Sequence, residues 1–211
     1  MSYVIKELRA FPTELPLREV ARYMGMRSDE VSSEISALIE KLLPVFLGEV
    51  RCRACWVETS VSISENIIDF GLTKLESKDL ARNLEGCSQA VLFAATIGNS
   101  VDRRCKSASI VSPSNAVVLD AMGSTAIEWF CDKLCGEFQK FHPGCELRPR
   151  FSPGYGDVPL EFQKDLLRIL DAQRKIGLTL SGSLMMLPQK SVTAIVGLCP
   201  RKTSYDKEVV L

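Results

Sequence analysis

The stretch from Arg148 to Glu161 constrains the fold most, because its backbone has few conformations open to it. Three prolines restrict the chain, and two glycines flank Tyr155, where they allow positive φ or a close approach of another group. Arg150 and Tyr155 add a permanent cation and an aromatic ring. This composition predicts a rigid loop that leads into a helix. It fits two interpretations equally: a stiff turn that ends in a helix N-cap, or a site for a small molecule.

Charge and motif content argue against several classes of function. The chain of 211 residues has 26 Lys and Arg against 26 Asp and Glu, which gives no electrostatic reason to expect nucleic acid or an anionic membrane as a partner. The turn at 98–100 lacks the glycine and lysine pattern of a phosphate-binding loop, so we exclude nucleoside triphosphate chemistry. No apolar run approaches a transmembrane helix in length, and no secretory signal is recognisable. We therefore expect a cytoplasmic protein.

Periodicity and capping residues predict a chain in which helices and strands are mixed. Ser28 and Ser114 stand before amphipathic runs, as helix N-caps do, and Gly25 ends a shorter helix that begins at Pro16. The expected helices span 16–24, 29–46, 77–86, 115–141 and 158–176, with another that begins near 101, and the expected strands span 3–8, 53–64, 66–72, 90–97, 178–187 and 190–198. The tail from 200 to 211 is expected to fray.

These elements predict an α+β fold, a mainly antiparallel twisted sheet with helices packed on one side. The run 90–97 is apolar throughout, which indicates a strand buried on both faces. The stretch 66–72 is expected to form a hairpin with the strand at 53–64. Asp157 is expected to cap the helix that follows it.

Eight cysteines leave a metal site open as an alternative. Cys52 and Cys55 have the spacing of half a zinc or iron–sulfur site, but a second such pair is absent and His142 is the only histidine. We expect reduced thiols that pack as small apolar side chains and hold no metal. Cys131 and Cys135 share one face of a helix, which fits core packing as well as it fits a site.

A polar stripe follows the longest expected helix. Asp120, Ser124 and Glu128 are four residues apart, so their side chains project in nearly one direction. Such a stripe is either a solvated surface or the wall of a site. The residues alone favour the solvated surface, because carboxylates are common on exposed helices.

The loop and its surroundings resemble the activation domain of cobalamin-dependent methionine synthase. The spacing Arg150-x-x-x-Gly154-Tyr155, followed by Pro159 and an amphipathic helix, is similar to the loop with which that family binds S-adenosylmethionine. The segment 126–130 is similar to the part of the preceding helix that carries a ligand-binding glutamate, here Glu128. The resemblance covers about residues 115–198 and also includes Gln163, the helix end at 176–177, the stretch 178–181 and the run from Met186 to Val192.

The resemblance implies a domain, a ligand and a partner. The domain would span 1–211, with a helical N-terminal portion at 1–50 and a ligand-binding core at 115–198. It implies a cofactor, S-adenosylmethionine, and the cofactor-binding residues Glu128, Arg150, Gly154, Tyr155, Gly156 and Asp157, with no catalytic residue. It implies reductive methylation of cobalamin held by a separate methionine synthase that lacks its own activation domain, with one electron from a donor such as a flavodoxin or ferredoxin. The pathway would be methionine biosynthesis.

The sequence departs from the family in three places. Asp157 stands where the long methionine synthases have alanine, and Glu146 differs in spacing from a second family glutamate. An N-terminal ligand aspartate has no matching position. The alternatives are a cysteine-ligated metal or iron–sulfur redox protein and a non-catalytic interaction module.

Overall fold

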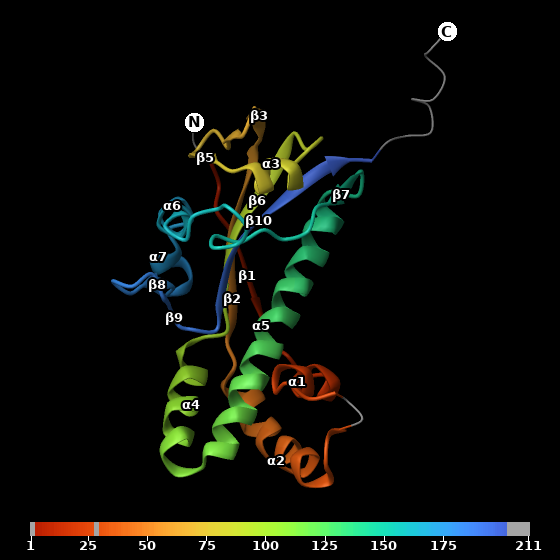
Figure 1. Ribbon diagram of the computed structural model, residues 1–211, viewed down its shortest axis with the longest axis vertical. Coiled ribbons are helices and arrows are strands. Elements are labelled where there is room, and N and C mark those ends of the chain that lie inside the picture. The colour runs from red at the N-terminus through yellow and green to blue at the C-terminus, as the bar shows by residue number, and fades with distance from the viewer. Residues whose placement is uncertain (1–2, 28–29, 202–211) are drawn as a thin grey trace.

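The computed structural model describes residues 3–27 and 30–201, and its centre is a five-stranded sheet in which every pairing is antiparallel (Figure 1). The strands follow the order β1-β2-β6-β10-β7 across the sheet. Their bounds are β1 (Lys6–Ala10), β2 (Cys52–Ser60), β6 (Gln89–Thr96), β10 (Ser191–Pro200) and β7 (Cys145–Leu147). The apolar run expected as a buried strand is β6, and its residues from Ala90 to Thr96 are all buried.

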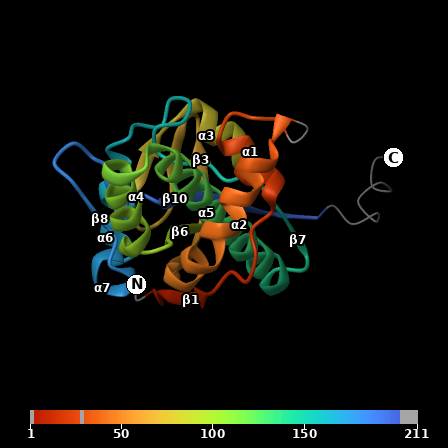
Figure 2. The same cartoon turned by 90° about the horizontal axis from the view of Figure 1, so that it is seen from below.

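Four helices cover one face of this sheet (Figures 1 and 2). They are α1 (Leu17–Tyr23), α2 (Ser33–Glu49), α4 (Asn99–Val111) and α5 (Pro113–Phe141). Trp56, Phe93 and Val196 point from three neighbouring strands into the core beneath them. Among the described residues, no helix has both the length and the apolar composition needed to cross a bilayer.

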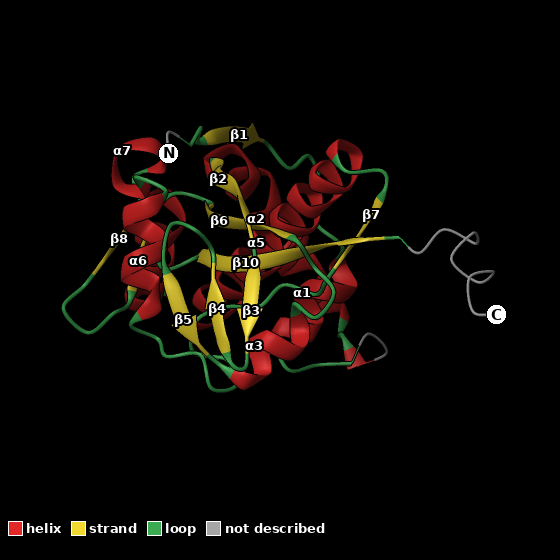
Figure 3. Ribbon diagram, turned by 90° about the horizontal axis from the view of Figure 1, so that it is seen from above, coloured by secondary structure: helices red, strands yellow, loops and turns green. Residues whose placement is uncertain are grey.

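Short elements cover the opposite face (Figures 1 and 3). They are α3 (Lys78–Asn83), α6 (Phe162–Ile169) and α7 (Ala172–Ile176), together with a small sheet of β3 (Ser62–Ser64), β4 (Ile67–Asp69) and β5 (Lys74–Glu76) and a hairpin of β8 (Thr179–Leu180) and β9 (Met186–Leu187). Val57, Leu92 and Ile195 alternate with the residues of the first core and point into this second one. The predicted α+β class with an antiparallel sheet is confirmed.

Several predicted elements differ from those observed because contacts distant in sequence decide them. The strand expected at 53–64 is divided at Val61 into β2 and β3. The stretch 66–72 supplies β4, which forms the expected hairpin with β3 and pairs on its other side with β5. The strand expected at 178–187 contributes only β8 and β9. The helix expected at 158–176 is two helices, because Asp171 adopts a left-handed conformation with φ of 47° between α6 and α7.

The predicted caps of two long helices also change. Ser32 caps α2 by accepting a hydrogen bond from the Ile35 amide, and the expected cap Ser28 lies outside the described residues, as does the tail from 202. Helix α5 begins at Pro113 after Ser112, two residues earlier than a cap at Ser114 requires.

Asp157 caps a different helix from the one predicted. Its carboxylate accepts hydrogen bonds from the Ser77 hydroxyl and from the backbone amides of Lys78, at 2.7 Å, and Asp79, at 3.3 Å. These donors are the N-terminus of α3, whereas α6 has no side-chain cap at its start. The Ser77 hydroxyl first, and then the two amides, hold the pKa of Asp157 below its usual value. Asp157 therefore anchors the loop to α3.

Substitution of Phe138 tests the first core. Phe138→Ala should lower the free energy of unfolding by about 3–5 kcal/mol, because the ring is 1% exposed and packs against Trp56 and Phe93 at centroid distances of 5.5 and 6.0 Å. Phe141→Ala, on the next turn of α5, is the matched control, since its ring is 57% exposed and should cost less than about 1 kcal/mol. Urea unfolding measures both, and equal losses would contradict the packing described.

The pH dependence of stability tests the role of Asp157. Because its pKa is lowered on folding, the charged carboxylate stabilises the fold fully above the unfolded pKa of about 3.9, and this contribution disappears as pH falls through the lower folded value. Asp157→Asn should therefore be less stable than the parent chain near neutral pH, and the difference should shrink in acid. Urea unfolding over a series of pH values checks this. A difference that stays constant at every pH would exclude a charged cap.

Candidate functional site

Arg150 lies between the loop and α5, and two carboxylates of that helix hold it. Its Nη2 donates to Oε2 of Glu128 at 2.7 Å and to Oδ1 of Asp132, one turn further on, at 3.1 Å. Burial lowers the pKa of Arg150, but Cys131 and the two carboxylates outweigh it, so the net pKa is raised and the guanidinium stays charged. Among the described residues, no oxygen accepts a hydrogen bond from its Nε or Nη1, although the guanidinium also interacts with the Cys131 thiol.

A hollow of about 320 Å³ opens beside this ion pair. It is lined by Glu128, Arg150, Phe151, Ser152, Tyr155 and Val192. The volume lies at the lower end of the range of about 300–1,000 Å³ that is typical of ligand pockets. Tyr155 is 72% exposed, so one side of the hollow is open to solvent and presents an aromatic ring.

The loop that carries Tyr155 is closed by its own backbone. The Gly154 amide donates to the Val158 carbonyl at 2.9 Å, and the Val158 amide donates back to the Tyr155 carbonyl at 3.0 Å. Gly154 and Gly156 have φ of 88° and 52°, values that favour glycine. A Cβ at Gly156 would also lie 2.5 Å from Oδ2 of Asp79, so the Asp79 side chain would have to move to admit a larger residue there.

Of the six predicted ligand-binding residues, Glu128, Arg150 and Tyr155 line the hollow. Gly154 and Gly156 shape the loop without lining the hollow, and Asp157 anchors it to α3. Nothing in the structure tests their binding of a ligand, so their assignment as binding residues stays a prediction.

Two basic side chains, Lys190 and Arg150, pair with the polar stripe on α5. Nζ of Lys190 lies 2.8 Å from Oδ1 of Asp120 and 2.9 Å from Oγ of Ser124. Its stem passes over Gly123, where a Cβ would lie 3.1 Å from two of its carbons. Asp132 continues the same spacing of four residues beyond Glu128 and binds Arg150. Sequence reasoning did not assign Asp132 or Lys190 to the site; extending the stripe by one more step would have found Asp132.

A second hollow, of about 200 Å³, lies on the other side of Glu128 and Asp132. Helix α1 forms its far wall with Glu19 and Tyr23, and Trp129 of α5 completes an aromatic lining. The N-terminal part of the chain thus brings a carboxylate close to Glu128. No motif predicted this, because the contact between α1 and α5 joins segments far apart in sequence.

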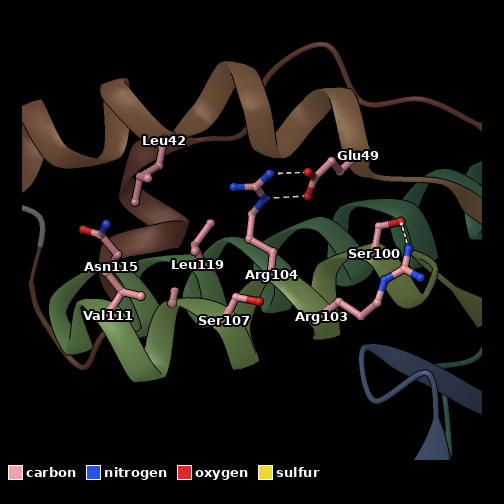
Figure 4. A pocket seen from close by; sticks show the side chains of 10 residues that line it. Leu42, Glu49, Ser100, Arg103, Arg104, Ser107, Val111, Asn115 and Leu119 are labelled. Carbon is pink, nitrogen blue, oxygen red and sulfur yellow. Dashed lines mark hydrogen bonds and ion pairs between the residues drawn. The ribbon is translucent and has the colours of Figure 1, made fainter.

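A larger hollow, of about 480 Å³, lies between α2, α4 and α5 (Figure 4). Arg104 forms a two-bond ion pair with Glu49 there, and Arg103 donates to the hydroxyl of Ser100. None of the residues that line it belongs to the loop or to the predicted ligand set. Its size alone therefore does not make it the favoured candidate.

The geometry of strand β2 argues against a metal or iron–sulfur site built on Cys52 and Cys55. Cys52 and Cys55 are three residues apart on β2, and they lie in the two core clusters on opposite faces of the sheet. Burial raises the pKa of each thiol to about 12, so neither is a thiolate near neutral pH. Within residues 3–27 and 30–201, no group of three or more His, Cys, Asp or Glu is placed to hold a metal ion.

Comparison with known proteins finds similarity among solved structures. No protein-family model matches the chain, and no curated protein matches its sequence. Among solved structures, the chain is similar to the one described as "Crystal Structure of the MetH Reactivation Domain bound to AdoHcy", with a TM-score of 0.73 over 96% of this chain and 80% of that chain. The sequence identity is 16%, so the similarity shows that the two share a fold. The fold implied by the resemblance is confirmed.

Proposed function

We propose that this chain binds S-adenosylmethionine in the hollow beside Arg150 and serves as the reactivation subunit of a separate cobalamin-dependent methionine synthase. The observation that carries the proposal is the convergence of Glu128, Arg150 and Tyr155 on one hollow. These three residues come from a helix and a loop that the sequence resemblance selected independently of any structure. The solved domain with the same fold holds S-adenosylhomocysteine, the product that remains when S-adenosylmethionine loses its methyl group.

The chemistry of the hollow suits this ligand. S-adenosylmethionine carries a carboxylate, an ammonium, a sulfonium and an adenine ring. The charged guanidinium of Arg150 retains donors for the carboxylate, and Glu128 and Asp132 supply negative charge for the cationic groups. The exposed ring of Tyr155 offers a flat surface for adenine.

Conservative substitution of Arg150 tests ligand binding. Arg150→Lys should weaken S-adenosylmethionine binding by about 1.5–3 kcal/mol, because a lysine cannot bridge two helix carboxylates and a ligand carboxylate with one planar group. Arg168→Lys is the matched control, since Arg168 is an exposed residue of α6 that pairs with Asp165. Titration calorimetry measures all three proteins. Equal affinity in the parent chain and Arg150→Lys would remove Arg150 from the site.

The open side of the hollow is consistent with a partner that must reach the ligand. A methyl group leaves the sulfonium only if its acceptor comes within bonding distance, and the proposed acceptor is a cobalt that another polypeptide holds. Tyr155 lines this open side and is 72% exposed, and Leu160 of the same loop, which lies next to Gly154, is 39% exposed. We place the docking surface there, and we expect it to be transient because the same cobalt must also face other substrates.

A reconstituted assay tests the partner. Oxidised methionine synthase that lacks an activation domain is mixed with S-adenosylmethionine and a one-electron reductant, and methylcobalamin is followed by its absorbance. Addition of this chain should accelerate methylation, and Arg150→Ala with an intact fold should abolish the acceleration. Methylation at the same rate without the chain would contradict the reactivation function while leaving ligand binding untouched.

A further inference from the structure

Cys87 and Cys199 lie on neighbouring segments at one end of the main sheet. Strands β6 and β10 pair with Gln89 opposite Leu198, and continuing this register places Cys199 opposite Ser88, the residue next to Cys87. Both cysteines are half-buried and both are free thiols. The two therefore meet outside the hydrophobic cores that hold Cys52 and Cys55.

The Cys87 sulfur lies close to the backbone at Gly197, and the Cys199 sulfur lies close to the backbone at Gly86. A Cβ at Gly197 would lie 2.7 Å from Sγ of Cys87, and a Cβ at Gly86 would lie 3.5 Å from Sγ of Cys199. Sγ of Cys199 also lies 3.5 Å from the Gly86 carbonyl oxygen, to which it donates a weak hydrogen bond. Glycine at both positions leaves room for the two thiols, which interact with one another.

Arg148 lies beside the pair with an unused donor. Its Nη2 donates to the Glu85 carbonyl at 2.8 Å, while its Nε is buried and has no acceptor among the described residues. Its Cγ lies 3.1 Å from the position of a Cβ on Gly197, the same position that abuts Cys87. Burial raises the pKa of the Cys87 thiol, and Arg148 opposes only part of that rise, so the net pKa stays above its usual value. A buried guanidinium donor without an acceptor beside a thiol is suited to stabilise the thiolate.

We propose that Cys87 and Cys199 form a redox-active dithiol that closes to a disulfide, with Arg148 as a positioning residue that stabilises the thiolate. The oxidant is a low-molecular-weight disulfide such as oxidised glutathione. One cysteine loses its proton and attacks that disulfide, which gives a mixed disulfide and one small thiol. The other cysteine then loses its proton and attacks the protein sulfur of the mixed disulfide, which forms the Cys87–Cys199 bond and releases the second small thiol.

The disulfide would form next to the segment that leads to the ligand hollow. The Arg148 amide donates to the Gly197 carbonyl at 2.9 Å, and the chain then continues directly to Arg150. Closure would tie the turn between α3 and β6 covalently to β10, the two elements between which this segment is held. The dithiol is independent of the proposed ligand, and its test requires none.

The experiment uses the full chain and oxidised glutathione. After incubation and blocking of free thiols, unreduced trypsin digestion places Cys87 in the peptide 83–103 and Cys199 in the peptide 191–201, each with a single cysteine. We expect these two peptides linked in one species and the link reversed by dithiothreitol, and before blocking the intact chain should be lighter by two hydrogen atoms. Linkage of Cys131 to Cys135 instead, or glutathione on single cysteines without a linked peptide, would overturn the proposal.

Variants separate a specific pair from general thiol oxidation. Cys87→Ser and Cys199→Ser should each abolish the link, whereas Cys105→Ser, a half-buried cysteine of α4, should retain it. Arg148→Met, which keeps the stem and removes the donors, should slow linkage at neutral pH and slow it less at alkaline pH, where the thiolate forms without help. Equal slowing at both pH values would assign Arg148 a packing role only.

Discussion

The pairing of Phe151 with Ile195 fixes the position of the candidate site. Each residue donates its amide to the carbonyl of the other at 2.9 Å, so the loop begins as an extension of the main sheet. Arg150, the preceding residue, is thereby held over α5, whose carboxylates it binds. The far end of the loop is fixed by Asp157 on the N-terminus of α3. A loop tied at both ends to packed elements presents its side chains in one geometry, which is the condition for a preorganised site.

Local signals in the sequence were sufficient for much of the fold. The uninterrupted apolar run of β6 and the long periodic pattern of α5 predicted both elements, because burial and periodicity are set by neighbouring residues. The serine before α3 predicted its start for the same reason. The break at Asp171 and the short β8 and β9 were not predictable in this way, since packing against the rest of the chain decides where α6 and the last helix separate.

The candidate site was likewise predictable from the sequence only in part. The resemblance identified Glu128, Arg150 and Tyr155, and the fold brings all three to one hollow. The helix that Asp157 caps was predicted wrongly, because its hydrogen-bond partner Ser77 lies 80 residues away and only the folded chain brings the two together. Lys190 was missed as a partner of the α5 stripe because its contact depends on how β10 crosses that helix.

The position of the bound ligand tests the account most directly. A crystal structure of the chain with S-adenosylhomocysteine, which lacks the reactive methyl group, should place the ligand carboxylate within hydrogen-bonding distance of Arg150 and the adenine against the ring of Tyr155. Helix α5 and the loop should move little from the geometry described here. Ordered ligand in the hollow between α2 and α4, beside Arg103, with the Arg150 hollow empty, would contradict the central claim.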